Sequence, residues 1–209
     1  MSRQARRLLK SAIDTACLVL VLPAALPCAL EARLGGGEAM FTSWAQAFAL
    51  VPGVPGVFLR RAFYRLTLEE CAHSFSIGFG AMFSHRTATV EADAYVGPYA
   101  VVGSCRLGRG CLVGTRASVL SGGHLHALGI DGWTAADLGR MQRIDIGEYA
   151  WIGESAVIVA NVGRAALIAA GSVVTSPVPA ETMVGGNPAR FVRRLREEVP
   201  SVPAAVPVR

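Results

Sequence analysis

Charged residues are scarce in this chain of 209 residues, since Asp, Glu, Lys and Arg make up only 17%. Apolar residues reach 52% and the mean hydropathy is +0.42, which excludes a disordered chain. The five cysteines are odd in number and form no Cys-x-x-Cys pair, so neither a disulfide framework nor a zinc knuckle is indicated. We expect all five thiols to be buried as small apolar groups.

The excess of basic residues lies at the two ends of the chain. The first ten residues carry four basic side chains and no acid, residues 190–209 carry five Arg and two Glu, and the residues between are net acidic. A nucleic-acid-binding domain needs a basic folded face with base-contacting groups. We therefore expect no nucleic-acid partner, and we interpret the basic N-terminus as attraction to anionic lipid.

Residues 17–30 form an uncharged run that contains Pro23 and Pro27 and is shorter than the ~20 residues of a spanning helix. Three interpretations are open: a signal-peptide core, a buried helix, or a membrane-inserted segment that bends at the prolines, with or without a return to the same face. We favour the membrane-inserted segment, because no A-x-A cleavage site follows. Whether it spans, re-enters or only packs on protein stays open.

Residues 39–66 combine aromatic rings with arginines, a mixture that suits a lipid headgroup interface. The alternative is that both N-terminal stretches pack on the rest of the protein or on another subunit. The Pro-Gly-Val-Pro-Gly run at 52–56 predicts a break between two short elements. The residues concerned are Phe41, Trp44, Phe48, Phe58, Arg60, Arg61, Phe63, Tyr64 and Arg65.

From about Ile77 onward, aliphatic residues recur every six positions and a small residue usually follows. A period of six fits neither an α-helix nor an alternating strand. It predicts a solenoid in which three flat sides close each coil and every aliphatic residue points inward. The twelve predicted inward residues are Val90, Val96, Val102, Leu107, Val113, Val119, Ile146, Ile152, Ile158, Val162, Ile168 and Val174.

The longest break in the repeat lies between Val119 and Ile146 and contains the sequence SGGHLH with His124 and His126. We expect residues 121–143 to be an extruded loop, the kind of segment where function concentrates. The chain then divides into a helical membrane-associated region at 1–72, the solenoid at 73–189, and a short basic helix with a tail at 190–209.

Three blocks of the repeat carry a resemblance: IGEYAWIGESAVI at 146–158, IAAGSVVTSPVP at 168–179 and VGGNPARFVRR at 184–194. With the loop, they make residues 78–194 resemble the hexapeptide-repeat acyltransferases, which include the galactoside and maltose O-acetyltransferases. The resemblance implies an all-β, left-handed parallel β-helix, a homotrimer, and acetyl-CoA as co-substrate. The apolar N-terminus is similar to that of membrane-associated members tied to capsule or exopolysaccharide assembly.

The resemblance also implies roles for individual residues. His124 would be the general base, His126 a second histidine of the loop, and Trp151 a wall of the substrate tunnel. The residues that would contact acetyl-CoA are Ala170, Gly171, Ser172, Thr175, Arg190 and Arg193. The acceptor-binding acid and asparagine of the sugar enzymes have no clear counterpart in this sequence.

The chemistry of acyl transfer to a hydroxyl agrees with these roles. A base must take the hydroxyl proton, for which histidine has a suitable unperturbed pKa, and the backbone N–H groups of Gly122 and Gly123 can face the developing oxyanion. His124 and His126 could instead hold a metal, but a third ligand is missing and we expect no metal. We expect His73 and His85 to be structural or interfacial, and spacing chooses no orienting acid among Asp131, Asp137 and Asp145.

The sequence therefore predicts an acetyl-CoA-dependent O-acetyltransferase at the cytoplasmic face of the inner membrane. Its acceptor would be a sugar hydroxyl of a lipid-linked glycan or exopolysaccharide precursor, acetylated by direct transfer. Two alternatives are a catalytically inactive scaffold of a membrane assembly and a soluble acetyltransferase for a small molecule.

Overall fold

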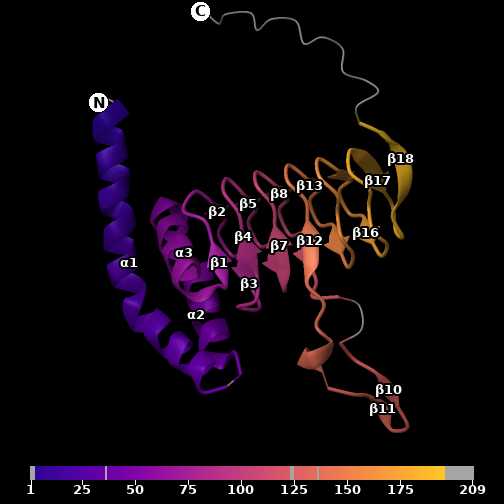
Figure 1. The fold of residues 1–209 in the computed structure, drawn as a ribbon, viewed down its shortest axis with the longest axis horizontal. Coiled ribbons are helices and arrows are strands. Elements are labelled where there is room, and N and C mark those ends of the chain that lie inside the picture. Colours follow the sequence, from indigo (N-terminus) through magenta and orange to yellow (C-terminus); the bar gives the residue numbers. More distant parts are fainter. Residues whose placement is uncertain (1–2, 36, 123–124, 136, 196–209) are drawn as a thin grey trace, which may run out of the picture.

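The computed structural model describes residues 3–35, 37–122, 125–135 and 137–195. Three helices come first: α1 (Arg3–Arg33), α2 (Ala39–Ala49) and α3 (Gly53–Thr67). A solenoid of about six coils follows from β1 (Glu70–Cys71), so it begins slightly before the predicted residue 73. Figure 1 shows the coils stacked along one axis, with the helices at one end and a long loop projecting from the side.

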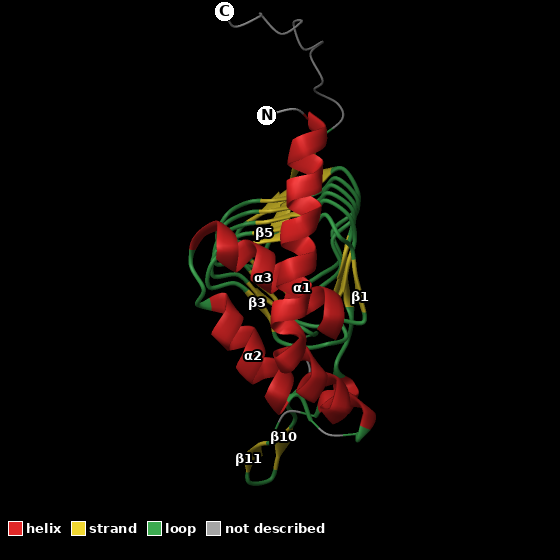
Figure 2. Ribbon diagram, turned by 90° about the vertical axis from the view of Figure 1, so that its left-hand side faces the viewer, coloured by secondary structure: helices red, strands yellow, loops and turns green. Residues whose placement is uncertain are grey.

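The coils up to β14 each contribute one short strand to each of three sheets, whose strands are parallel except for the last one, β18 (Figure 2). The first sheet holds β1, β4 (Thr89–Val90), β7 (Cys105–Leu107) and β12 (Ile144–Ile146). The second holds β2 (Ser76–Ile77), β5 (Tyr95–Val96), β8 (Leu112–Val113), β13 (Trp151–Ile152), β15 (Leu167–Ile168), β17 (Thr182–Gly185) and β18 (Arg190–Arg194). The third holds β3 (Met82–Phe83), β6 (Val101–Val102), β9 (Ser118–Val119), β14 (Val157–Ile158) and β16 (Val173–Val174).

The core of the solenoid is the stack of inward aliphatic residues that the six-residue period predicts. All twelve predicted residues are buried, with exposures of 0 to 3%. Ile77 and Phe83 extend the pattern into the first coil and are also fully buried. A Cβ on Gly114 would lie 2.7 Å from the backbone nitrogen of Glu154 in the next coil. The small residue after each aliphatic residue is therefore required by close stacking of the coils.

The N-terminal helices cover the first coil (Figure 2). Helix α1 runs unbroken through Pro23 and Pro27, so of the open alternatives the one in which the segment turns back to the same face is wrong. Two prolines four residues apart remove only two of the amide donors in a helix of 31 residues. A break was predicted within residues 52–56. The helices are separated at the beginning of this run, because α2 ends at Ala49 and α3 begins at Gly53.

Most aromatic rings of residues 39–66 face protein, so the headgroup interpretation is wrong for them. Phe41, Phe63 and Tyr64 are fully buried, and Tyr64 packs edge-on against Phe83 of the first coil at 4.9 Å. The Tyr64 hydroxyl accepts a hydrogen bond from the Phe83 amide at 3.1 Å. These rings join the helices to the solenoid, as the packing alternative requires. Trp44 stays 37% exposed.

The segment after residue 189 is a strand and not the basic helix that we expected. Strand β18 pairs antiparallel with β17, which would otherwise leave an open sheet edge at the end of the solenoid. Residues 196–209 of the expected tail lie outside the described residues. The five cysteines are free, and all except the partly buried Cys71 are buried, in agreement with their expected role.

Candidate active site

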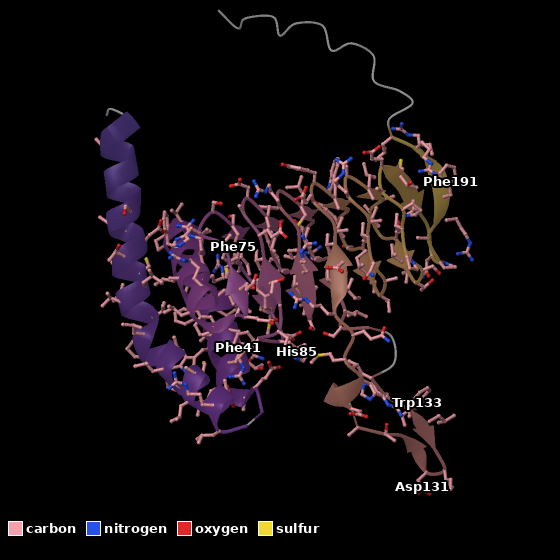
Figure 3. All side chains as sticks on the ribbon, viewed as in Figure 1. Phe41, Phe75, His85, Asp131, Trp133 and Phe191 are labelled. Atoms are coloured by element: carbon pink, nitrogen blue, oxygen red, sulfur yellow. The ribbon has the colours of Figure 1, made fainter. Side chains whose placement is uncertain are left out.

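The extruded loop leaves the solenoid after β9 and returns at β12, as the break in the repeat predicts. It carries a two-stranded hairpin of β10 (Leu128–Gly129) and β11 (Gly132–Trp133), followed by the short helix η1 (Leu138–Arg140). Figure 3 shows the hairpin, with Asp131 and Trp133, standing well away from the coils. His124 and Gly123 lie outside the described residues.

A cavity of about 540 Å³ lies where the loop leaves the solenoid. Its walls come from the loop and from the corner that follows the third sheet: Ser84, His85, Val101, Gly103, Val119, Leu120, Ser121, Gly122, Leu125, His126 and Val159. The His126 Nδ1 lies 2.9 Å from the carbonyl oxygen of Thr134. Because a carbonyl only accepts hydrogen bonds, Nδ1 carries a proton, and in the neutral ring Nε2 holds the lone pair.

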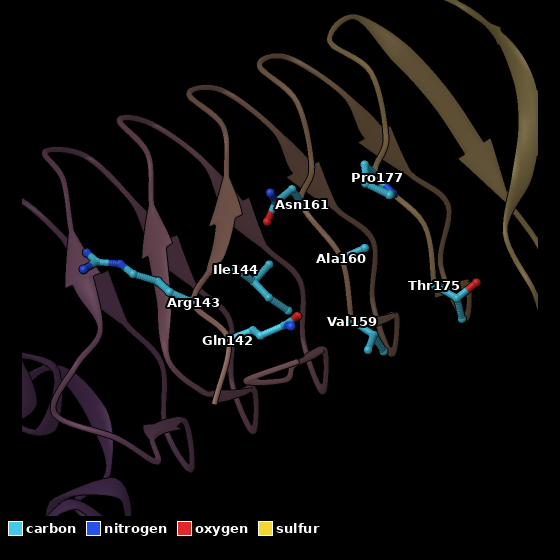
Figure 4. Close-up of a pocket in the computed structure, with 8 residues that line it drawn as sticks. All are labelled: Gln142, Arg143, Ile144, Val159, Ala160, Asn161, Thr175 and Pro177. Atoms are coloured by element: carbon cyan, nitrogen blue, oxygen red, sulfur yellow. The ribbon is translucent and has the colours of Figure 1, made fainter. Parts of the chain in front are cut away.

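Two further cavities continue from the first along the same side of the solenoid. One of about 560 Å³ shares Val159 with it and also contacts Thr175 and Pro177 (Figure 4). The next, of about 250 Å³, shares Thr175 and Pro177 and ends at Arg190. We call these three neighbouring cavities the loop-side groove. The loop histidine lines the first of them, and two of the predicted acetyl-CoA residues, Thr175 and Arg190, line the others.

Two other predicted residues lie on a different face of the same chain. Trp151, which is 53% exposed, and Ala170 line a separate cavity of about 590 Å³ on the outer side of the second sheet. Ser172 is fully buried and its hydroxyl accepts a hydrogen bond from the Gly186 amide at 3.1 Å. Gly171 occupies the neighbouring corner with a positive φ of 67°. The hydroxyl of Ser172 is thus engaged in holding the last coils together.

Arg190 and Arg193 share one face, although they lie on a strand and not on a helix. The pairing register shifts at Val192, so that Arg190 is opposite Gly185 and Arg193 is opposite Met183. Gly185 and Met183 are two residues apart on β17 and therefore face the same side. Of the two predicted arginines, Arg190 lines the loop-side groove together with Arg194, whereas Arg193 is not among its lining residues.

His85, which we expected to be structural or interfacial, contacts Glu38 of the helical region and also lines the first cavity. It lies two residues after the inward Phe83, as Ser121 lies two residues after the inward Val119. Because β3, β6 and β9 pair in register, these positions stack at the same corner of successive coils. The step from the inward Phe83 to the inward Val90 is seven residues, so the six-residue count from Val90 reaches Ser84 and did not by itself place His85 beside the start of the loop.

The three candidate orienting acids do not contact the described histidine of the loop. Asp137 pairs with Arg140 at 3.4 Å, Asp145 lies 3.8 Å from Arg106, and Asp131 is at the hairpin tip (Figure 3). Within the described residues, no group of three His, Cys, Asp or Glu side chains is placed to hold a metal ion. One helical segment, residues 11–33, is long and apolar enough to cross a membrane.

Comparison with known proteins relates this geometry to acetyltransferases. No protein-family model matches the chain. Serine acetyltransferase 2 of Arabidopsis thaliana is 31% identical over 128 residues, which are 60% of this chain and 32% of that protein. A putative acetyltransferase of Staphylococcus aureus is 40% identical over 60 residues, 28% of this chain and 30% of that protein. The matches thus span about a third of the length of these relatives.

One solved structure determines the fold class. The crystal structure of a hexapeptide-repeat-containing acetyltransferase from Vibrio cholerae superposes with a TM-score of 0.55 and 23% identity, covering 74% of this chain and 90% of that chain. The predicted left-handed parallel β-helix is confirmed by this likeness.

Proposed function

We propose that this protein is an acetyl-CoA-dependent O-acetyltransferase that modifies a sugar hydroxyl of a lipid-linked glycan or exopolysaccharide precursor. The observation that carries the proposal is the loop-side groove, which begins at the interrupted coil with His126 and ends at Arg190. A hydroxyl acceptor fits the end near the histidines, and the phosphates of a nucleotide fit the end near arginine. The acetyltransferase names of the similar proteins support the donor.

The residues at the loop support direct transfer without an acyl-enzyme. His124 takes the proton of the acceptor hydroxyl as its oxygen attacks the thioester carbonyl, and the coenzyme thiolate leaves. The amides of Gly122 and Gly123 face the developing oxyanion. His126, with Nδ1 held by Thr134, presents Nε2 as a second acceptor of hydrogen bonds.

The assembly that we propose is a homotrimer. Trp151 and Ala170 lie on the second sheet, away from the loop-side groove of their own chain. A neighbouring copy that lays its second sheet against the groove would bring these residues to the donor site. Exposed apolar side chains on this sheet, Tyr95, Leu112 and Trp151 among them, support such a contact.

We propose that α1 lies in the plane of the membrane, at its cytoplasmic face. The outward side of α1 exposes Val19, Leu20, Leu22, Leu26 and Leu30, each by more than 40%. Both ends of this stretch are held on the body of the protein: Asp14 pairs with Arg61, and Arg86 donates to the Cys28 carbonyl at 2.7 Å. A helix held along one side by protein offers only its other side to lipid, which favours in-plane binding over spanning.

Titration calorimetry of the detergent-solubilised full chain with acetyl-CoA tests the donor. We expect micromolar binding that is lost when Arg190→Ala and Arg193→Ala are combined, and retained when the exposed Arg33 and Arg109 are changed to Ala together. His124→Ala should keep binding and lose transfer. Absence of binding by a folded protein would refute the transferase and leave the scaffold.

Mixed oligomers test the shared site. If His124→Ala and Trp151→Ala are each inactive, co-expression of the two variants should restore part of the activity, because one interface then combines an intact groove with an intact second sheet. Activity that stays absent in verified mixed oligomers would refute a site built from two copies.

Vesicle flotation tests the membrane face. The wild type should float with phosphatidylglycerol vesicles, and Leu20→Ser, Leu26→Ser and Leu30→Ser together should abolish flotation. The matched control changes three hairpin residues that are at least as exposed, Leu128, Ile130 and Trp133, to Ser. Single changes Ser11→Cys and Leu34→Cys should both react with an impermeant maleimide from outside the vesicle, whereas a spanning helix would leave one of them protected.

A further inference from the structure

A histidine and a carboxylate from distant parts of the chain meet beside the loop-side groove. His85, at the corner after β3, lines the first cavity together with His126. Its Nδ1 lies 2.6 Å from Oε2 of Glu38, which immediately precedes α2. The side chains are only 19% and 21% exposed. Figure 3 shows His85 at the lower edge of the solenoid, between the helices and the loop.

Glu38 is held as a carboxylate in one orientation. Its Oε1 accepts a hydrogen bond from the Arg86 amide at 2.8 Å, and the Arg86 guanidinium lies 3.6 Å away. Burial alone would raise the pKa of Glu38, but the hydrogen bonds from His85 and the Arg86 amide outweigh it and lower that pKa. The carboxylate therefore remains ionised and fixed at neutral pH.

The consequence for His85 is a defined tautomer. A carboxylate accepts only, so Nδ1 carries a proton, and in the neutral ring Nε2 holds the lone pair. No described residue is hydrogen-bonded to Nε2, and the ring lines the cavity. A histidine whose second nitrogen is bound to a carboxylate is oriented to accept a proton or a hydrogen bond, and the carboxylate stabilises the imidazolium that forms.

We propose that His85 binds the acceptor, accepting a hydrogen bond from a hydroxyl of the sugar through Nε2, and that Glu38 is its positioning residue. This inference rests on the proposed function and names the acceptor side of the same site. Beside His85, the cavity offers the hydroxyl of Ser84 and the apolar surface of Val101 and Leu120. The cavity thus has hydrogen-bonding groups next to an apolar wall. This combination matches a sugar ring, which has hydroxyl groups at its edge and apolar faces.

The position of Glu38 also couples the acceptor side to the helices. The Arg86 guanidinium that approaches Glu38 donates to the carbonyls of Cys28 and Gly37 at 2.7 and 2.6 Å. The turn that joins α1 to α2 is thus part of the structure that orients His85. An acceptor carried on a lipid would meet His85 close to the helix that we assign to the membrane surface.

Steady-state kinetics on the full chain in detergent test the inference, with CoA release followed for D-glucose, D-galactose and maltose as probe acceptors. His85→Gln and Glu38→Gln should each raise the KM of the best probe roughly tenfold or more, the effect of losing a hydrogen bond with charged character. The Kd of acetyl-CoA should not change. The double variant should be no worse than His85→Gln, because the two residues act as one unit.

His73→Gln is the matched control, since His73 is an exposed histidine of the same first coil that lies 3.4 Å from Arg65 and outside the cavity. Its KM and thermal unfolding should match the wild type. Unchanged acceptor KM in both variants would overturn the inference and leave the proposed function intact. If the wild type binds acetyl-CoA but acetylates none of the sugars, both the sugar acceptor and the role of His85 in binding it are refuted. If the wild type binds no acetyl-CoA, the proposed function itself is refuted.

Discussion

Replacement of Arg60 by Met should destabilise the junction between the helices and the solenoid. The guanidinium is fully buried in α3, and no acidic side chain pairs with it among the described residues. Its Nη1 donates to the carbonyls of Phe48 and Val51 at 3.1 and 2.7 Å, and its Nε donates to that of Ile77 at 3.2 Å. Arg60 thereby ties the end of α2 to the first coil. Burial lowers its pKa.

The magnitude follows from the carbonyls that Met cannot satisfy. Among the described residues, Arg60 donates to the carbonyl oxygens of Val51 and Ile77. The carbonyl oxygen of Phe48 also accepts a hydrogen bond from the Val51 amide at 3.2 Å, so it keeps a partner when Arg60 is replaced. Each orphaned carbonyl costs about 1–3 kcal/mol. Removal of a buried charge offsets part of this cost. We expect a loss of about 3 kcal/mol in the free energy of unfolding.

Denaturant unfolding monitored by Trp44 measures this loss. Trp44 lies in α2, so Trp133→Phe and Trp151→Phe together leave one reporter in the helices. Arg109→Met is the control, because Arg109 is exposed. A value for Arg60→Met within about 0.5 kcal/mol of the control, the usual range of surface changes, would refute the reasoning.

The remaining predictions concern the stacking of the coils and the loss of folding stability at acidic pH. Gly153→Ala should lower stability by about 1–3 kcal/mol or more in thermal unfolding, because its Cβ would lie 2.5 Å from the Ala170 nitrogen, while Gly129→Ala meets only an ordinary contact at 3.5 Å and should be tolerated. The folded-state pKa of Glu38 is lowered from its ordinary value of 4.5, so its stabilisation is present above pH 4.5 and lost as the pH falls through the folded pKa. Wild type should therefore lose stability faster than Glu38→Gln below pH 4.5, and parallel curves would contradict this.

The solenoid and its loop could be predicted because each hexad repeats one local rule. An aliphatic residue points inward and a small residue permits the next coil to approach, whatever lies elsewhere in the chain. An interruption of that rule can only leave the coil, which is why the loop at 121–143 was found from spacing. Phe83 lies seven residues before Val90 and so falls outside the six-residue count, and a single histidine before the regular repeat gave no sign of its partner.

The N-terminal helices and the chain end could not be predicted in this way. Aromatic rings beside arginines occur at lipid headgroups and also where helices pack on a core, and only the contacts of Tyr64 and Arg60 with the first coil distinguish the two. Residues after 189 have the spacing of a basic helix, yet the open edge of β17 gives hydrogen bonds to a strand. In this segment the helical spacing of the side chains was outweighed by the need of backbone N–H and C=O groups for hydrogen-bond partners.

The sequence by itself thus determined the coil, its inward residues and the place where the chain leaves it, since these depend on neighbours within six residues. Tertiary structure alone decided which side chains meet. Glu38 and His85 are 47 residues apart and become partners because α2 covers the first coil. Trp151 and Thr175 are only 24 residues apart and lie on different faces, because each sits on its own side of a three-sided coil.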